Sequence, residues 1–268
     1  MRNILTFIIP VRHQDNAKNW VYLKRNLGET IASIAQQKVG GWQAIIVANN
    51  GADLPAMPPG FTVKRVDFPP NQMHELGQNN REDFYEAVRL DKGRRILAGM
   101  LAAGEAGHLM VVDDDDFISC NLTGFVASNP QAYGWYFRDG YVWSGGDMLY
   151  HYGDFSRLCG TSHIVRSDLY KLPARFEDAT DAYIKRTLGS HIFLEDDLKA
   201  AGTPLVPLPF AGTIYRTGHQ ESHSQSNSII KHFLWTDATK RNPLRLLRRL
   251  LRLRFRTNGI KQEFACIS

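Results

Sequence analysis

This sequence of 268 residues lacks the features that would place it across a membrane or in an oxidising compartment. It has no apolar run of about 18 residues, which a transmembrane helix requires. The N-terminal stretch MRNILTFIIPVRHQD has only a short apolar part and no small-residue cleavage site, so we expect no signal peptide. Cysteine is scarce, because Cys120, Cys159 and Cys266 form an odd set without metal-site spacing. We therefore expect a cytoplasmic protein.

Net basic charge is confined to one segment. The formal net charge is +5, but residues 240–256 (KRNPLRLLRRLLRLRFR) carry eight basic and no acidic residues, so the rest of the chain is net acidic. A chain without a basic groove in its main part is not expected to bind nucleic acid. Internal repeats and low-complexity linkers are also absent. Hydrophobic residues make up 43% and charged residues 22%, which is ordinary for a soluble globular protein.

The length fits one large domain, or one domain with an appendage. The clearest change of composition lies near Pro243, before the basic segment. We expect a main domain over residues 1–235, whose halves are 1–116 and 117–235, and a basic tail over 236–268.

Strand patterns alternate with helix patterns in the first half, which predicts a parallel sheet with helices on both faces. The second half is aromatic over residues 132–153, with an expected hairpin turn at Asp139-Gly140 and a helix start at Ser167. The expected strands are 5–11, 42–51, 61–68, 108–113, the start of 160–170 and the start of 211–224. The expected helices are 17–38, 82–106 with an interruption near residues 91–93, and 192–202 with its C-cap at Gly202.

Four adjacent carboxylates, Asp113 to Asp116, follow directly after the apolar run HLMVV. Like charges in a row repel one another, so water or a cation must offset the repulsion. Ligands of open parallel sheets bind at the carboxyl ends of the strands. Hard oxygen ligands at such an end suit Mg²⁺ or Mn²⁺, and the alternative is a solvated acidic turn.

Five motifs in order, IIPVRHQD, IIVANNG, MVVDDDDFIS, FLEDDL and YRTGHQESHS, resemble the GT-A glycosyltransferases in the pattern of bacterial glycosyltransferase family 2. The resemblance covers roughly residues 3–225. It implies a Rossmann-like α/β fold, with a mixed, mainly parallel sheet flanked by helices and, here, a C-terminal basic amphipathic helix. The first half, 1–116, would bind a nucleotide sugar, and the second half, 117–235, would bind the acceptor.

By this resemblance, the residues after the first strand would flank the nucleotide base: Pro10, Val11 and Arg12. Asn50, where the family often has aspartate, would contact the base or the ribose. Lys92 and Arg95 would face the base or the diphosphate, because basic groups make charge-assisted bonds to phosphate. The alternative for these two residues is a solvated helix face.

By the same resemblance, the four aspartates of the acidic loop would have different roles. Asp113 would lie on the ribose side, and Asp115 would hold the Mn²⁺ or Mg²⁺ that bridges the two phosphates. Asp116 would contact the sugar or a water on the metal, and Asp114, in the nucleotide-sugar loop, would point away. The metal would orient the diphosphate and neutralise the charge that grows on the leaving group.

A late histidine often completes this metal site in the family, and His219 resembles it. Imidazole beside a carboxylate suits Mn²⁺ better than Mg²⁺. YRTGHQESHS has one residue more than the usual tyrosine-arginine-x-histidine form, so His223 is a rival, and a solvated loop histidine is the alternative for both.

Inversion at an anomeric carbon needs a general base, and the family's E-D pair maps onto Glu195 and Asp196. Asp196 would be the base, and Glu195 would hold the acceptor or orient the loop. A one-residue shift of register would make Asp197 the base instead. The alternative for all three is stabilisation of a helix N-terminus by negative charge.

Acceptor contacts would come from Trp135, Tyr136 and Trp143, which could stack on a sugar ring or form the core of a hairpin. Gly160 and Thr161 lie where family members shape the acceptor pocket.

A helical wheel predicts a basic amphipathic helix over residues 244–256, with seven apolar residues within an arc of roughly 200° and most arginines opposite. Such a helix lies on an anionic membrane surface. Alternatively, its leucines pack on the domain.

These observations predict a metal-dependent inverting glycosyltransferase that moves a hexose from a nucleotide sugar, UDP-linked by preference. Its acceptor would be a hydroxyl of a glycan or lipid-linked glycan in surface polysaccharide assembly, at the inner face of the cytoplasmic membrane. Three alternatives stay open: a retaining transferase of the same fold, a nucleotidyltransferase, and a non-enzymatic membrane adaptor. The nucleotidyltransferase lacks its usual glycine-rich phosphate loop near the N-terminus.

Overall fold

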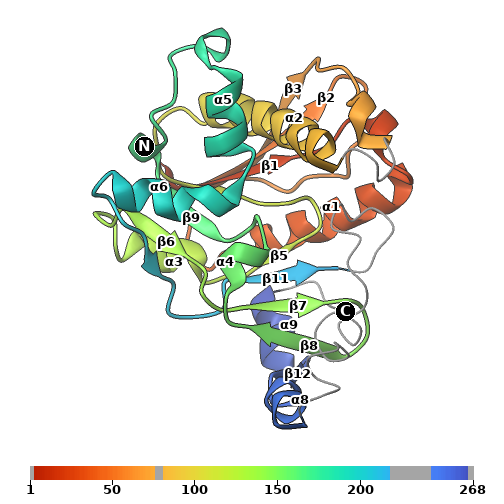
Figure 1. The fold of residues 1–268 in the computed structure, drawn as a ribbon, viewed down its shortest axis with the longest axis vertical. Coiled ribbons are helices and arrows are strands. Elements are labelled where there is room, and N and C mark those ends of the chain that lie inside the picture. Colours follow the sequence, from red (N-terminus) through yellow and green to blue (C-terminus); the bar gives the residue numbers. More distant parts are fainter. Residues whose placement is uncertain (1–2, 76–80, 218–242, 265–268) are drawn as a thin grey trace.

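The computed structural model describes residues 3–75, 81–217 and 243–264 (Figure 1). A seven-stranded sheet runs in the order β10-β6-β9-β4-β1-β2-β3. Neighbouring strands are parallel except where β9 pairs with β4 and β6. The strands are β1 (Asn3–Pro10), β2 (Trp42–Asn49), β3 (Phe61–Val66), β4 (Ala106–Val111), β6 (Gly134–Tyr136), β9 (His163–Arg166) and β10 (Val206–Pro207). The expected fold class, a mixed and mainly parallel sheet with flanking helices, is confirmed.

Helices cover both faces of this sheet. The α1 helix (Trp20–Ala35) packs Leu23 and Leu27 against Phe7 of β1, whereas α2 (Arg81–Ala102) packs against the opposite face, where Ile8 points. Because successive side chains of a strand alternate between faces, a sheet covered on both sides needs apolar residues at every position. This is why the core strands read as continuous apolar runs in the sequence.

A second sheet of five short strands runs in the order β12-β8-β7-β11-β5. Its strands are β5 (Phe117–Ile118), β7 (Gly140–Trp143), β8 (Met148–Tyr152), β11 (Thr213–Arg216) and β12 (Leu253–Phe255). The α9 helix (Asn258–Phe264) closes its core, because the fully buried Phe264 packs with Phe117, Leu149 and Ile214. Figure 1 shows this sheet beside α9, with α8 (Pro243–Leu250) at the lower end of the molecule.

The remaining elements are short. The remaining helices are α3 (Leu122–Ala127), α4 (Phe155–Leu158), α5 (Asp181–Tyr183) and α6 (Leu194–Ala200). Single turns are η1 (Gln14–Asn16), η2 (Gln72–Glu75), η4 (Ser167–Tyr170), η5 (Phe176–Asp178), η6 (Ile184–Leu188, a π-helical turn) and η7 (His191–Phe193). Within the described ranges, no helix is both long and apolar enough to cross a membrane.

Three sequence-based expectations about secondary structure are wrong. The helix over 82–106 is not interrupted at residues 91–93, since α2 runs unbroken from Arg81 to Ala102; Gly93 instead allows close packing against the backbone of η6. Asp139-Gly140 is no hairpin turn, since β6 and β7 belong to different sheets. The hairpin joins β7 to β8 instead, through Gly145 and Gly146, whose φ angles of 96° and 74° favour glycine.

The third correction concerns the basic tail. The helix expected over 244–256 ends at Leu250, and residues 253–255 form strand β12 against β8. Backbone pairing with an open sheet edge satisfies hydrogen bonds that a local wheel analysis does not consider. Thus residues 253–264 pack on the second sheet, while most leucines of α8 stay exposed.

Candidate active site

A cavity of about 290 Å³ lies at the carboxyl ends of β1 and β4. Its charged lining residues are Arg12, Arg89, Asp91, Lys92, Arg95, Asp113, Asp114 and Asp115. They come from the loop after β1, from one side of α2 and from the loop after β4. The chain therefore brings the predicted basic and acidic residues together around one space.

The acidic loop is held in place from α2 and from the segment before β9. Lys92 Nζ donates to Asp113 Oδ1 at 2.5 Å, and the backbone N–H of Asp113 donates to Thr161 Oγ1 at 2.9 Å. Burial lowers the pKa of Lys92, but the charge and hydrogen bond of Asp113 outweigh this and the net pKa is raised. A Cβ at Gly160 would lie 3.0 Å from Asp113 Oδ2 and 3.1 Å from Lys92 Nζ. Gly160 and Thr161 thus shape the acidic loop itself.

Asp114 and Asp116 lie differently from what the family resemblance implies. Asp114, expected to point away, lines the cavity, and burial raises its pKa to about 7 against the opposing charge of Arg12. Asp116 is fully buried and accepts hydrogen bonds from the Arg216 N–H at 3.2 Å and from Cys159 Sγ at 3.4 Å. Burial raises its pKa as well. A direct sugar contact by Asp116 does not fit this position.

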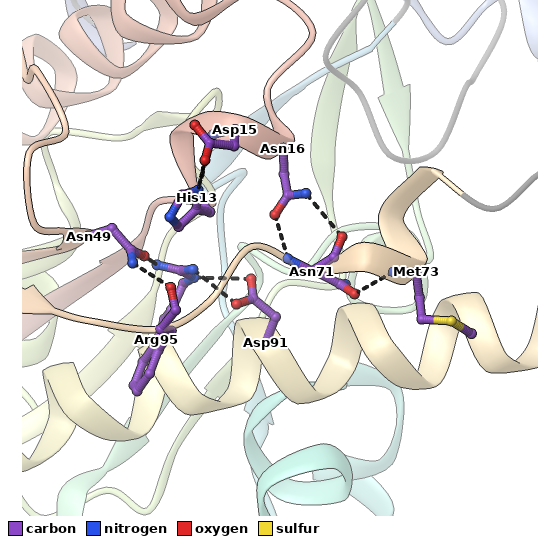
Figure 2. Close-up of polar contacts among 9 residues, drawn as sticks. His13, Asp15, Asn16, Asn49, Asn71, Met73, Asp91 and Arg95 are labelled. Atoms are coloured by element: carbon purple, nitrogen blue, oxygen red, sulfur yellow. Dashed lines mark hydrogen bonds and ion pairs between the residues drawn. The ribbon is translucent and has the colours of Figure 1, made fainter.

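Arg95 is a buried residue in the wall of the cavity. Figure 2 shows its contacts with Asp91 and Asn49. Its guanidinium binds both carboxylate oxygens of Asp91 at 3.0 Å and the side-chain oxygen of Asn49 at 2.6 Å. Asn49 in turn donates to the Phe68 carbonyl at 2.6 Å. Three of the Arg95 donors therefore already have partners, and its main contribution is to join α2 to the end of β2.

The neighbouring Asn50 is exposed and does not line the cavity. The motif IIVANNG offers two adjacent amides, and only the strand register decides that Asn49 points inward. Val11 also departs from expectation, because its side chain is fully buried and its N–H donates to the Val47 carbonyl at 2.9 Å. Pro10 and Arg12 line the cavity as expected.

Sequence reasoning missed His191, which lines the cavity from the turn η7. Within the described part of the chain, its buried Nε2 has no hydrogen-bond partner. Burial, with the charge of Lys92, lowers the pKa of His191 to about 4, so the imidazole is neutral at pH 7. A Cβ on Gly160 would lie 3.7 Å from His191 Nδ1, which places the ring beside the Lys92–Asp113 pair. Only its position in the sequence, shortly before the motif LEDDL, could have drawn attention to it.

Asp196, the predicted general base, does not line the cavity. Asp196, in the first turn of α6, has a side chain that is 69% exposed and pairs with Arg157 at 3.1 Å. Glu195 hydrogen-bonds the buried His163 at 3.2 Å. Burial raises the pKa of Glu195, but the hydrogen bonds from His163 and Ser156 have a larger combined effect, so the net pKa is lowered. Neither carboxylate lines the cavity. They follow directly after η7, whose His191 and Ile192 do line it.

Two predicted aromatic contacts belong to the core. Trp135 is 3% exposed and its ring lies 5.2 Å from that of Phe125, so it cannot stack on a sugar. Trp143 is half-buried in the second sheet, where its ring packs against Phe117 and under the Arg216 guanidinium. The alternative reading, core packing, holds for both residues, although they do not share a hairpin.

The metal-site histidines, His219 and His223, lie outside the described residues. Within the described ranges, no group of three or more His, Cys, Asp or Glu side chains is arranged to hold a metal ion. Mg²⁺ nevertheless binds commonly through one or two carboxylates together with substrate phosphates and waters. Asp114 and Asp115, which both face the cavity, fit this sparse mode of binding.

Comparisons with known proteins give distant likenesses. No protein-family model matches the sequence, and no curated protein matches it. The S. aureus TarS 1-349 structure is 13% identical with a TM-score of 0.43, covering 81% of this chain and 60% of that chain. The manganese complex of Rv0371C from Mycobacterium tuberculosis H37Rv is 11% identical with a TM-score of 0.39, covering 80% and 92%. A further mycobacterial protein is 11% identical with a TM-score of 0.40, covering 84% and 70%.

This chain thus spans 60% of the length of the TarS structure. Likenesses of this size do not bear on activity, which has to be argued from the cavity and its residues.

Proposed function

We propose that this protein is a metal-dependent glycosyltransferase that takes a hexose from a nucleotide sugar, UDP-linked by preference. One observation carries the proposal: acidic and basic side chains converge on one cavity at the carboxyl ends of parallel strands. A diphosphate needs cationic partners, and a divalent ion needs carboxylates. The cavity lining offers both kinds of group.

The basic side chains would bind the diphosphate. Arg12 and Arg89 line the cavity, and Lys92 faces it from its ion pair with Asp113. Arg95 would act indirectly, because its bonds to Asp91 and Asn49 orient the part of α2 that carries Lys92. This division of roles modifies the expectation that Lys92 and Arg95 act alike.

Asp115, together with Asp114, would hold Mn²⁺ or Mg²⁺. The ion would supply charge neutralisation for the leaving nucleoside diphosphate. The protonated form of Asp114, favoured by its raised pKa, would have to lose its proton to act as a ligand. Metal affinity should therefore fall as the pH decreases below about 7.

We propose inversion, with Asp196 as general base and Glu195 as its neighbour on the acceptor side. The supporting observation is that α6 begins directly after the cavity-lining turn η7. The acceptor would be a hydroxyl of a glycan or a lipid-linked glycan, as in surface polysaccharide assembly. A retaining transferase of the same fold is the competing hypothesis, and it would need no base.

Thermal unfolding with UDP, GDP, CMP and ATP, each with and without Mn²⁺, tests the donor site. A ligand that binds only the native state stabilises it by about 2.7 kcal/mol at a hundred times its Kd. We expect a Mn²⁺-dependent shift with UDP that Asp115→Ala abolishes. Asp147→Ala is the matched control, since Asp147 lies on the β7–β8 turn with an 85% exposed side chain.

A shift with GDP or CMP in place of UDP would retain the transferase and change the donor. If none of the four nucleotides shifts the transition, the donor-site proposal is wrong.

Product release from UDP-hexose, with NMR assignment of the new anomeric linkage, tests the chemistry. Removing a general base lowers kcat by roughly 10²–10⁴-fold, so we expect a loss of this size in Asp196→Asn. Asp197→Asn is the neighbouring control, because Asp197 forms a two-bond pair with Arg186. Full activity in Asp196→Asn with a retained anomeric configuration would favour the retaining transferase, and a loss confined to Asp197→Asn would move the base by one residue.

A further inference from the structure

Exposed apolar side chains gather at one end of the molecule. Of the ten large hydrophobic residues that are exposed among the described residues, five lie between 244 and 255. We call these five the C-terminal apolar patch: Leu244 (69% exposed), Leu247 (54%), Leu250 (43%), Leu251 (67%) and Phe255 (72%). The other five are scattered along the chain. A local concentration of this kind marks an interaction surface.

The orientation of α8 separates the patch from the domain. The half-buried residues Leu246 and Arg249 mark the side of the helix that faces the protein. At about 100° per residue, the four exposed leucines occupy one arc of about 120° beside it. Arg245 and Arg248 lie on the remaining arc and are exposed. The leucines therefore do not pack on the described part of the domain, which was one of the two readings of the sequence.

The patch is built into the fold. The chain leaves α8 and pairs as β12 with β8, where Leu253 is opposite Tyr150. The carbonyl of Arg252 accepts a hydrogen bond from the His151 N–H at 2.9 Å, and Arg256 lies over the Trp143 ring at 5.7 Å. These contacts fix α8 at the lower extremity of the molecule, beyond β12 (Figure 1). Among the described elements, none is drawn beyond α8 at that end in Figure 1.

The segment that carries the patch has charge of one sign, and the nearby Asp147 pairs with Arg256 at 4.0 Å. Residues 243–262 contain arginine and lysine but no aspartate or glutamate. A second copy of the chain docking through this face would bring two arginine clusters together, which costs energy. A nucleic acid would pair with the arginines but would leave the leucines in water. An anionic membrane matches both parts, because acyl chains receive the leucines and phosphate headgroups receive the arginines.

We infer that this end of the protein docks on anionic lipid membranes. The leucines of α8 and Phe255 enter the interface between headgroups and acyl chains, and arginines such as Arg248 and Arg252 bind lipid phosphates. Strand β12 and helix α9 hold this surface rigidly on the second sheet. The inference is independent of the donor site, since none of these residues lines the cavity.

Vesicle co-sedimentation of the full chain tests the inference. The probes are vesicles of phosphatidylcholine alone and vesicles of phosphatidylcholine with phosphatidylglycerol. We expect binding to the anionic vesicles that weakens with added salt, and weak or no binding to the neutral ones. Leu247→Glu with Leu251→Glu should weaken binding about tenfold or more, and Arg248→Gln with Arg252→Gln should do the same at low salt.

The matched control is Val21→Glu with Val206→Glu, which adds the same charge at exposed apolar residues outside the patch (79% and 50% exposed). It should bind vesicles much as the unchanged chain does. Equal binding by the leucine pair and by this control would overturn the inference, as would a failure of the unchanged chain to bind anionic vesicles. Sedimentation velocity adds a further arm: a dimer lost in the leucine pair, without vesicle binding, would assign the patch to a second copy. Nucleotide-induced stabilisation, measured on the same variants, reports separately on the donor site.

Discussion

Burial shifts the protonation of single residues in the wall of the cavity, in opposite directions for acids and bases. Asp114 has a pKa raised to about 7, and His191 has a pKa lowered to about 4. In both cases the largest cause is removal of the charged form from water, and in both cases burial favours the neutral group. Both shifts therefore favour uncharged side chains in the wall of the cavity.

The first prediction concerns His191 and the pH dependence of stability. An unfolded histidine takes up its proton near pH 6.5, whereas folded His191 does so near pH 4. The lowered pKa therefore contributes stability that is present above pH 6.5 and is lost as the pH falls toward 4. Relative to His191→Gln, the unchanged protein should lose on the order of 2 kcal/mol of unfolding free energy between pH 8 and pH 5.

Urea denaturation of both proteins at a series of pH values measures this difference. Between pH 7 and 8.5 the difference should be constant, which serves as the internal control. A difference that also stays constant down to pH 5 would contradict the burial of a neutral imidazole at this position.

At the scale of elements, α2 is the scaffold of the cavity. It carries Asp91, Lys92 and Arg95 in one turn, and it presses against the π-helical turn η6 at Gly93. A Cβ at Gly93 would lie 2.5 Å from the Ile184 carbonyl oxygen, so this glycine is needed for close packing, not for flexibility. The turn η6 leads on to Gly189 and Ser190 in the cavity wall, which ties the geometry of the cavity to this contact.

The second prediction compares two glycines inside helices. Alanine normally stabilises a helix interior by about 1 kcal/mol relative to glycine. Gly28→Ala in α1 should follow this rule, because its Cβ would meet only the Pro55 Cβ at 3.7 Å. Gly93→Ala should instead destabilise the protein by about 1–3 kcal/mol through overpacking. Thermal or urea unfolding distinguishes the two, and stabilisation by Gly93→Ala would show that η6 does not sit against α2 as described.

At the scale of the whole molecule, the C-terminal segment supports the strand that follows the acidic loop. Glu263 accepts from Ser119 Oγ at 2.6 Å, and its carbonyl accepts from the Cys120 N–H at 3.0 Å. Phe264 packs on Phe117, the residue directly after Asp116. Residues 263 and 264 therefore contact strand β5 and the two residues that follow it. The second sheet lies between the cavity, which Tyr215 of β11 lines, and the C-terminal apolar patch.

The third prediction follows from this packing. Phe264→Ala should cost about 3–5 kcal/mol, as is usual for a fully buried phenylalanine. Phe255→Ala, at a 72% exposed position in the same segment, should change the unfolding free energy by about 0.5 kcal/mol or less. The midpoints of urea unfolding measure both effects. Equal, small effects would mean that α9 is not part of the core.

The amino-acid sequence by itself predicted strands β1 to β4 of the first sheet and the place of the cavity. Apolar runs such as LTFIIPV and HLMVV are long enough to be read without any knowledge of their neighbours, since both of their faces are buried. Their polar ends then had to meet at one edge of a parallel sheet. This reasoning located Asp113 to Asp115, and the family resemblance pointed to Arg12; all four residues line one cavity.

Only the tertiary structure decided which side chains face that cavity. Asp116 turns inward because it accepts a hydrogen bond from the backbone of Arg216, a hundred residues away. Strand register places the side chain of Asn49, and not that of Asn50, where it accepts a hydrogen bond from Arg95. The small second sheet is built from short strands that pair across long separations, including β12 with β8. Periodicity reports only on local geometry, whereas these outcomes depend on partners that lie far along the chain.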